Sequence, residues 1–167
     1  MKRIDPKELK PNAIKLISDG WMLITAGTPD NFNTMTASWG ALGELWSKPV
    51  AFVFIRPQRY TYGFVEQNEM LTLSFFDEKY RDALRFCGSH SGRDTDKIAE
   101  TGLTPYTTEI GNVAFQEASI VLECRKLYRA EMKADCFLDR TIIERAYPDG
   151  DFHTTYVVEI VNAWVKE

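Results

Sequence analysis

The sequence predicts a mainly β protein, an antiparallel β-barrel with short helical insertions. Its apolar stretches are mostly about five to ten residues long, which is the length of β-strands. Segments with helical spacing are short and do not alternate regularly with the strands, as a doubly wound α/β fold requires. No GxGxxG fingerprint follows the first strand, which argues against a Rossmann-type nucleotide site. An antiparallel barrel accommodates this order of elements.

The first predicted elements are a short helix and a β-hairpin. Residues 11–17 have the pattern of a short helix, which Asp19-Gly20 ends. Residues 21–26 form a compact apolar strand, and the turn residues at 28–31 lead into a second extended stretch. We therefore expect a hairpin over residues 21–39.

The next strand and helix are predicted to bring an arginine and a helix N-terminus to the same place. Residues 50–55 are apolar at every position, which predicts a strand buried on both faces that ends at Arg56. A short helix is expected over residues 62–68, with Thr61 as its N-cap. The free N–H groups of this helix would face the same position as Arg56, where an anion could bind.

The rest of the chain is also predicted to consist of short strands, short helices and loops. Residues 70–76 alternate as a strand, and the apolar positions that follow predict a helix over residues 79–86. The glycine- and serine-rich stretch 87–97 is a loop, and Asp94 or Thr95 is expected to cap the helix after it. The remaining predictions are strand material over 119–124 and 126–132, a short helix within 137–146, a turn at 147–150 and a final strand over 153–165.

Composition limits the class of protein. The 167 residues are 44% hydrophobic, and a chain of this size buries roughly two thirds of its unfolded surface, so we expect a single domain over residues 1–167. The net charge is −4 and no polybasic run is present, so a nucleic acid partner is not expected. The apolar runs are too short to cross a bilayer, and the N-terminus lacks the apolar stretch of a signal peptide. These observations predict a cytoplasmic protein.

The few cysteines and histidines do not form a metal-binding pattern. Cys87, Cys124 and Cys136 are widely spaced and lack a CxxC motif, so buried reduced thiols are expected and no metal site is predicted. Cys87 is interpreted as a packed thiol rather than a redox centre. His153 is expected on a strand surface or at a dimer interface rather than in catalysis, whereas the role of His90 stays open.

Two stretches carry the candidate site. Residues 33–40 place amide, hydroxyl and small side chains beside an indole, a surface that a ligand can approach closely. Residues 56–61 supply two guanidinium groups and two hydroxyls around a proline, which suits an anion such as phosphate. The loop at 87–97 is a third candidate part of the site. Together they predict a flat ligand with a phosphate tail.

Each stretch alone has a simpler interpretation. Residues 33–40 could be only a hairpin strand with a tryptophan in the core, and Arg56 and Arg59 could be solvated or paired with Glu66 or Asp77. The conjunction of the three stretches favours the ligand site.

These residues also carry a resemblance to a known family. Asn33-Thr34-Met35-Thr36-Ala37-Ser38-Trp39-Gly40, Arg56-Pro57-Gln58-Arg59-Tyr60-Thr61 and Ser91-Gly92-Arg93-Asp94-Thr95-Asp96-Lys97 resemble the flavin reductase-like family of FMN-binding split barrels, particularly its flavoredoxin type. The resemblance extends roughly from Ile17 to Trp164. It implies an antiparallel, Greek-key-like split β-barrel, a homodimer, and FMN held noncovalently near the subunit interface.

The resemblance also assigns residues to parts of the cofactor. Residues 35–39 would lie along the isoalloxazine ring, residues 56–61 would bind the phosphate and ribityl end, and the loop at 87–97 would close over it. Cys87, Gly88 and His90 match no role in the family. The implied cofactor-binding residues are Asn33, Met35, Thr36, Ala37, Ser38, Trp39, Arg56, Arg59, Tyr60, Thr61, Ser89, Ser91 and Lys97.

The expected activity is that of an FMN-dependent oxidoreductase. NADH or NADPH would reduce the bound FMN, which would pass electrons to oxygen, free flavin, a metal complex or a protein acceptor. A flavin supplies its own electron sink, so no catalytic side chain is expected. The alternative is an FMN-binding electron carrier or storage module without NAD(P)H turnover. A barrel that binds a different anion or haem is a third possibility, although neither histidine is in a context that predicts a haem ligand.

Overall fold

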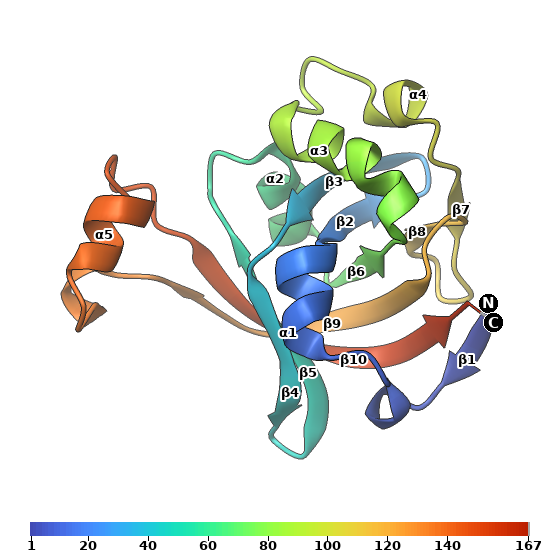
Figure 1. Cartoon of the computed structure of the whole chain (residues 1–167), viewed down its shortest axis with the longest axis horizontal. Coiled ribbons are helices and arrows are strands. Elements are labelled where there is room, and N and C mark those ends of the chain that lie inside the picture. The colour runs from blue at the N-terminus through green and yellow to red at the C-terminus, as the bar shows by residue number, and fades with distance from the viewer. Residues whose placement is uncertain (167) are drawn as a thin grey trace.

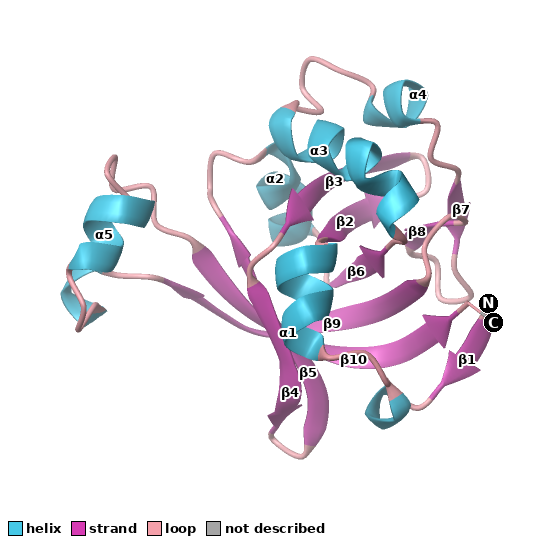
Figure 2. Cartoon of the chain, in the orientation of Figure 1, coloured by secondary structure: helices cyan, strands magenta, loops and turns pink. Residues whose placement is uncertain are grey.

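The computed structural model describes residues 1–166 and confirms the mainly β, antiparallel prediction. Eight strands form one sheet in the order β3-β2-β6-β9-β10-β5-β4, with β1 paired to β10, and β7 and β8 form a separate hairpin. Figure 1 shows the main sheet curving around the core, and Figure 2 shows that the helices are short and lie at its periphery. The strands are β1 (Lys2–Ile4), β2 (Met22–Thr28), β3 (Asn31–Ala37), β4 (Gly40–Leu45), β5 (Lys48–Ile55), β6 (Met70–Phe75), β7 (Pro105–Thr107), β8 (Val113–Phe115), β9 (Ile120–Glu131) and β10 (Thr154–Val165).

The helices connect and cover the strands. No helix in residues 1–166 is both long enough and apolar enough to cross a membrane. The α-helices are α1 (Ala13–Lys15), α2 (Tyr60–Gln67), α3 (Arg81–Ser89), α4 (Lys97–Thr101) and α5 (Thr141–Ala146). A π-helical turn at Leu16–Gly20 continues α1, and single 3-10 turns lie at Pro6–Glu8, Glu78–Tyr80 and Ala134–Cys136.

The main core lies inside the curved sheet. Alternate residues of β2, β5, β6, β9 and β10 point inward, and Tyr156 and Leu122 are completely buried there. The hairpin predicted over 21–39 is present as β2 and β3. The prediction that β5 is buried on both faces was wrong, because Phe52 and Phe54 on its outer face are only half-buried.

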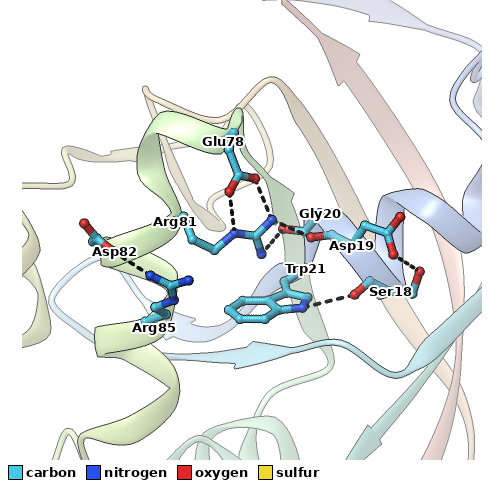
Figure 3. A network of polar contacts seen from close by, with 8 residues as sticks. All are labelled: Ser18, Asp19, Gly20, Trp21, Glu78, Arg81, Asp82 and Arg85. Carbon is cyan, nitrogen blue, oxygen red and sulfur yellow. Dashed lines mark hydrogen bonds and ion pairs between the residues drawn. The ribbon is translucent and has the colours of Figure 1, made fainter.

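A second apolar cluster fixes α3 against the outside of β2 and β9. Leu84 and Cys87 of the helix are buried in this cluster. At the start of the helix, Arg81 donates hydrogen bonds to the carbonyls of Asp19 and Gly20 and to the Glu78 carboxylate, and its guanidinium lies 4.2 Å from the ring centroid of Trp21 (Figure 3). The helix and the loop that follows it are thereby fixed relative to β2 and β3.

The hairpin formed by β4 and β5 was not anticipated. Leu45 pairs with Lys48, so only Trp46 and Ser47 form the turn. Their φ angles of 54° and 57° are those of a two-residue turn that favours Asn-Gly. Since neither residue is glycine or asparagine, the usual sequence signal is missing.

Two predicted helix caps were wrong. Thr61 lies inside α2, because Arg59 occupies the N-cap position. Asp96, rather than Asp94 or Thr95, caps α4 by accepting hydrogen bonds from Ile98 N and Ala99 N. The N–H groups of Asp94 and Thr95 instead close a turn onto the Ser91 carbonyl.

The cysteine prediction holds for two of the three thiols. Cys87 and Cys124 are buried and form no disulfide, as expected, whereas Cys136 is exposed. Cys136 lies in a segment that packs against few neighbours, the arm between β9 and β10.

This arm, residues 132–153, projects away from the barrel and carries α5 (Figure 1). Arg56 holds the returning part of the arm through an ion pair with Asp151 and a 2.7 Å hydrogen bond to the Ala146 carbonyl. Near the barrel, Tyr147 Oη and His153 Nδ1 are 2.7 Å apart. The base of the arm is therefore fixed to the barrel, next to the end of β5.

Candidate functional site

The three predicted stretches converge on two cavities that share Arg59. The first, called here the Trp39 cavity, has a volume of about 170 Å³ and is lined by residues 35–39, Phe54, Arg56, Arg59 and His153. The second, called the Ser91 cavity, has a volume of about 240 Å³ and is lined by residues 58–61, 88–91, Arg93 and Lys97. Other cavities are larger, so the assignment of the site depends on its chemistry rather than on volume.

β3 presents its outward side chains to the Trp39 cavity. Met35 and Ala37 are buried, whereas Thr36 and Ser38, which alternate with them, are half-buried. The Thr36 hydroxyl donates a hydrogen bond to the Leu84 carbonyl of α3. A Cβ on Gly88 would lie 3.3 Å from Thr36 Cβ, so this glycine lets α3 approach the strand closely.

The indole of Trp39 forms an exposed wall of the same cavity. Trp39 is 51% exposed, and its ring centroid lies 5.4 Å from that of His153. The indole is therefore available to a planar ligand on one side and supported by an aromatic residue on the other.

Among residues 1–166, Arg59 alone lines both cavities, and its guanidinium has no partner there. It is half-buried, yet it forms no side-chain hydrogen bond or ion pair within residues 1–166. Burial and the neighbouring Arg56 lower its pKa, but an arginine remains cationic at physiological pH. A partly desolvated cation without a counter-ion is stabilised by a bound anion.

Lys97 lies at the floor of the Ser91 cavity. It is 5% exposed, and its Nζ donates hydrogen bonds to the carbonyls of Thr34 at 2.8 Å and Cys87 at 2.9 Å. An ammonium has three donors, so one is left for another acceptor. Burial lowers the pKa of Lys97 to about 8. The same burial raises the pKa of the Cys87 thiol, which agrees with its interpretation as a packed thiol.

Asn33 supports the site from behind. Its Nδ2 donates a 2.7 Å hydrogen bond to Thr61 Oγ1, which joins β3 to the first turn of α2. Asn33 lines neither of the two cavities and faces a third one instead. Asn33 therefore positions Thr61, and its direct contact with the cofactor stays a prediction.

Two other predicted residues are already engaged within the protein. Arg56 lines the Trp39 cavity but not the Ser91 cavity, and it is paired with Asp151 rather than with Glu66 or Asp77. Ser89 lines the Ser91 cavity, but its hydroxyl donates to the Arg85 carbonyl at 2.9 Å. Arg56 therefore joins the arm to the barrel, and its contact with the cofactor stays a prediction.

His153 is the site residue that sequence reasoning missed, and its expected place on a strand surface was wrong. It is 8% exposed, and burial lowers its pKa to about 4, with Arg56 adding to the effect. Tyr147 Oη lies 2.7 Å from Nδ1. Nε2 has no hydrogen-bond partner within residues 1–166, and His153 lines the Trp39 cavity.

The register of β10 explains the position of His153. Thr154 pairs with Ile55, so His153 comes to lie beside Arg56. Only this long-range pairing could have identified the histidine, because its sequence neighbours carry no binding motif.

The sequence matches the family described as "Flavin reductase like domain" over residues 14–167. The chain belongs to this family. Among solved structures, the flavin reductase-like domain superposes on flavoredoxin from Methanosarcina acetivorans with a TM-score of 0.70 at 19% identity, covering 89% of this chain and 69% of that one. No curated protein sequence matches the chain.

Two further structures have similar folds. An FMN-binding protein from Thermus thermophilus, solved with bound 1-cyclohex-2-enone, has a TM-score of 0.69 at 22% identity and covers 87% of this chain and 69% of that one. An NADH:FAD oxidoreductase from Streptomyces globisporus has a TM-score of 0.67 at 18% identity and covers 88% of this chain and 75% of that one.

The family assignment confirms the predicted fold and the prediction of a flavin cofactor, and two of these neighbours are named for FMN or as a flavoredoxin. The residues of the flavin reductase-like domain fit FMN chemically. The Ser91 cavity offers cationic groups and N–H donors for a phosphate, and the Trp39 cavity offers an aromatic wall and uncommitted polar atoms for a ring.

Proposed function

We propose that the protein is an FMN-dependent oxidoreductase that takes electrons from NADH or NADPH and passes them to free flavin, a metal complex or a protein acceptor. The unpaired Arg59 between the two cavities is the observation that carries this proposal. It marks where the charged part of a ligand meets its planar part. Bound FMN would supply the electron-accepting chemistry, which no side chain of the protein provides.

The phosphate-binding groups come from three elements. Arg59 supplies a free guanidinium, and Lys97 supplies a buried ammonium with one donor left. The N-terminus of α2 follows Arg59 directly, and its unpaired N–H groups favour an anion. Tyr60 and Ser91 line the same cavity, with Thr61 held in place by Asn33.

The ring-binding groups lie on β3 and at the base of the arm. Residues 35–39 would lie along the ring, and the Ser38 hydroxyl has no hydrogen-bond partner within residues 1–166. His153 is neutral at pH 7 because its pKa is lowered, and Tyr147 fixes the orientation of its ring. If Tyr147 donates to Nδ1, Nε2 carries the proton and can donate a hydrogen bond into the cavity.

Removal of Arg59 tests the proposal. We expect Arg59→Ala to weaken FMN binding by about 30-fold or more, whereas the affinity for riboflavin, which has no phosphate, should change little. The apoprotein would be titrated with both flavins and followed by quenching of flavin fluorescence. Arg85→Ala is the control, because Arg85 lies on α3 and pairs only with the exposed Asp82. Unchanged FMN affinity in Arg59→Ala would contradict the proposal.

One observation favours a second candidate, an FMN-binding electron carrier or storage module. The Trp39 cavity has a volume of about 170 Å³, which is small for a ring together with a stacked nicotinamide. Anaerobic mixing of the FMN-loaded protein with NADH and NADPH separates the two candidates. A reductase loses its oxidised flavin spectrum, whereas a carrier retains it.

We also propose that the protein is a homodimer. Large apolar side chains are exposed on the β4–β5 hairpin, on β9 and on the arm, and Leu138 is 102% exposed. Side chains of this size are uncommon on the surface of a monomer when they gather on neighbouring elements. The other members of this set are Trp46, Tyr128 and Ile142.

A further inference from the structure

A third cavity adjoins the proposed phosphate site. This cavity, called here the Phe32 cavity, has a volume of about 610 Å³, within the usual range of small-molecule sites. It lies between the β2–β3 turn and the loop that leads into α4. It shares Arg93 and Lys97 with the Ser91 cavity, so the two cavities adjoin at these cations.

A buried polar group without a partner faces the Phe32 cavity. Asn33 is 7% exposed, and its Nδ2 is bonded to Thr61. Its Oδ1 accepts no hydrogen bond within residues 1–166 and lies close to Gly92, which lines this cavity together with Asn33. A carbonyl oxygen that is fixed in this way can accept a hydrogen bond from a ligand.

The rest of the lining combines apolar surface with exposed carboxylates. Phe32 and Pro105 provide flat apolar surface, and Asp30 and Asp94 are exposed at the rim. Neither carboxylate forms a side-chain hydrogen bond or an ion pair within residues 1–166. An aromatic surface suits a nucleobase, and carboxylates accept hydrogen bonds from the hydroxyls of a ribose.

We propose that the Phe32 cavity binds the adenosine half of a dinucleotide whose phosphates lie beside Lys97 and Arg93. The inference rests on the proposed function, because it takes the Ser91 cavity as the place of the flavin phosphate. The adenosine belongs either to FAD, bound in place of FMN, or to NADH. In both cases the carboxylates of Asp30 and Asp94 select a free 2′-hydroxyl against a 2′-phosphate.

The test fills the cavity without touching the phosphate site. Asn31 is exposed and lines the Phe32 cavity, so Asn31→Trp places an indole in it. Glu100→Trp is the matched control, because Glu100 is exposed on α4 but does not line the cavity. Binding of FMN and FAD to the apoprotein is measured, followed by binding of NADH, NADPH and reduced nicotinamide mononucleotide to the FMN-loaded protein.

We expect one of the dinucleotides to bind at least tenfold more tightly than its mononucleotide counterpart. Asn31→Trp should remove this advantage and leave FMN affinity within twofold, whereas Glu100→Trp should preserve it. An advantage of FAD over FMN identifies the flavin as the source of the adenosine. An advantage of NADH over both the mononucleotide and NADPH identifies the electron donor.

Equal affinities for dinucleotide and mononucleotide in both pairs would overturn the inference and leave the FMN site unaffected. AMP alone provides a direct probe by NMR. It should shift backbone amide signals of residues 30–34 and 92–98 in the wild type and not in Asn31→Trp. If AMP shifts these signals but FMN does not bind, the proposed function fails while the nucleotide site stands.

Discussion

At the scale of single residues, the charge of Lys97 should make FMN binding depend on pH. Burial lowers its pKa to about 8, so in the free protein the amine loses its proton as the pH rises through that value. A bound phosphate favours the ammonium and raises the pKa again. FMN binding above pH 8 therefore takes up a proton, and FMN affinity should fall between pH 7 and 9.5.

Riboflavin, which lacks the phosphate, should not show this loss. Titrations of both flavins at the two pH values measure the difference, and Lys97→Met, which cannot titrate, should weaken FMN binding at pH 7 and remove the dependence. Parallel pH profiles for FMN and riboflavin in the wild type would contradict a phosphate beside Lys97.

Gly92 should be intolerant of a side chain. A Cβ at this position would lie 2.0 Å from Asn33 Oδ1, and Asn33 holds Thr61. We expect Gly92→Ala to weaken FMN binding by about tenfold and to destabilise the protein by about 1 to 2 kcal/mol. Gly43→Ala is the control, because nothing lies within 4 Å of a Cβ there. Isothermal titration and urea unfolding measure the two effects, and equal behaviour of the two variants would disprove the prediction.

His153 should make the protein less stable in mild acid. Its folded-state pKa is about 4, below the unfolded value of about 6.5, so the unfolded chain binds more protons between these values. Stability is therefore full above pH 6.5 and falls as the pH drops toward 4. Between pH 7 and 5 the loss from this residue should be on the order of 1 kcal/mol. Urea unfolding of the wild type and His153→Gln at both pH values measures it, with His90→Gln as the control that retains the loss.

At the scale of elements, sequence patterns succeeded where the decisive contacts are local. The β2–β3 hairpin has an apolar first strand, a Thr-Pro-Asp-Asn turn and an extended second strand, so its prediction needed only nearby residues. The β4–β5 hairpin turns through Trp46 and Ser47 at positive φ, which the residue types do not signal. The cap of α4 was predicted wrongly because Asp94, Thr95 and Asp96 are all residue types that cap helices. The turn of Asp94 and Thr95 onto the Ser91 carbonyl leaves Asp96 as the cap, and residue types alone do not signal this turn.

The arm depends on Arg56, which supplies its main polar link to the barrel. Arg56→Ala removes both the ion pair to Asp151 and the bond to the Ala146 carbonyl, and it leaves a half-buried carboxylate without a cation. We expect faster amide hydrogen exchange over residues 141–153, while the exchange of β6 and β9 stays unchanged. Arg140→Ala, which loses only a bond within the arm, is the control. Arm exchange that is unaltered by Arg56→Ala would show that packing alone holds the segment.

At the scale of the whole molecule, the three motifs predicted the convergence of the site but not its internal roles. Residues 35–39, 59–61 and Lys97 line two adjoining cavities, as their chemistry suggested. Arg56 and His153 could not be assigned, because the pairing of β10 with β5 and the return of the arm decide what they contact. Their roles in cofactor binding, and a single domain over residues 1–167, stay predictions.

The exposed apolar surface leads to a prediction about assembly. If Leu138 packs against a second copy, Leu138→Asp should convert a dimer into a monomer, which sedimentation velocity measures directly. Ile110→Asp is the control, because Ile110 is 52% exposed on the distant β7–β8 hairpin. A wild-type protein that sediments as a monomer at all concentrations would contradict the proposed homodimer.

The pairing of β1 with β10 places Lys2 beside Val165, so the two ends of the chain lie next to each other (Figure 1). A short peptide linker could therefore join them, and new ends could be opened at the exposed tip of the arm, near Leu138. Such a circular permutant would retain every strand of the barrel, and it would interrupt the arm at the residue proposed to contact a second copy.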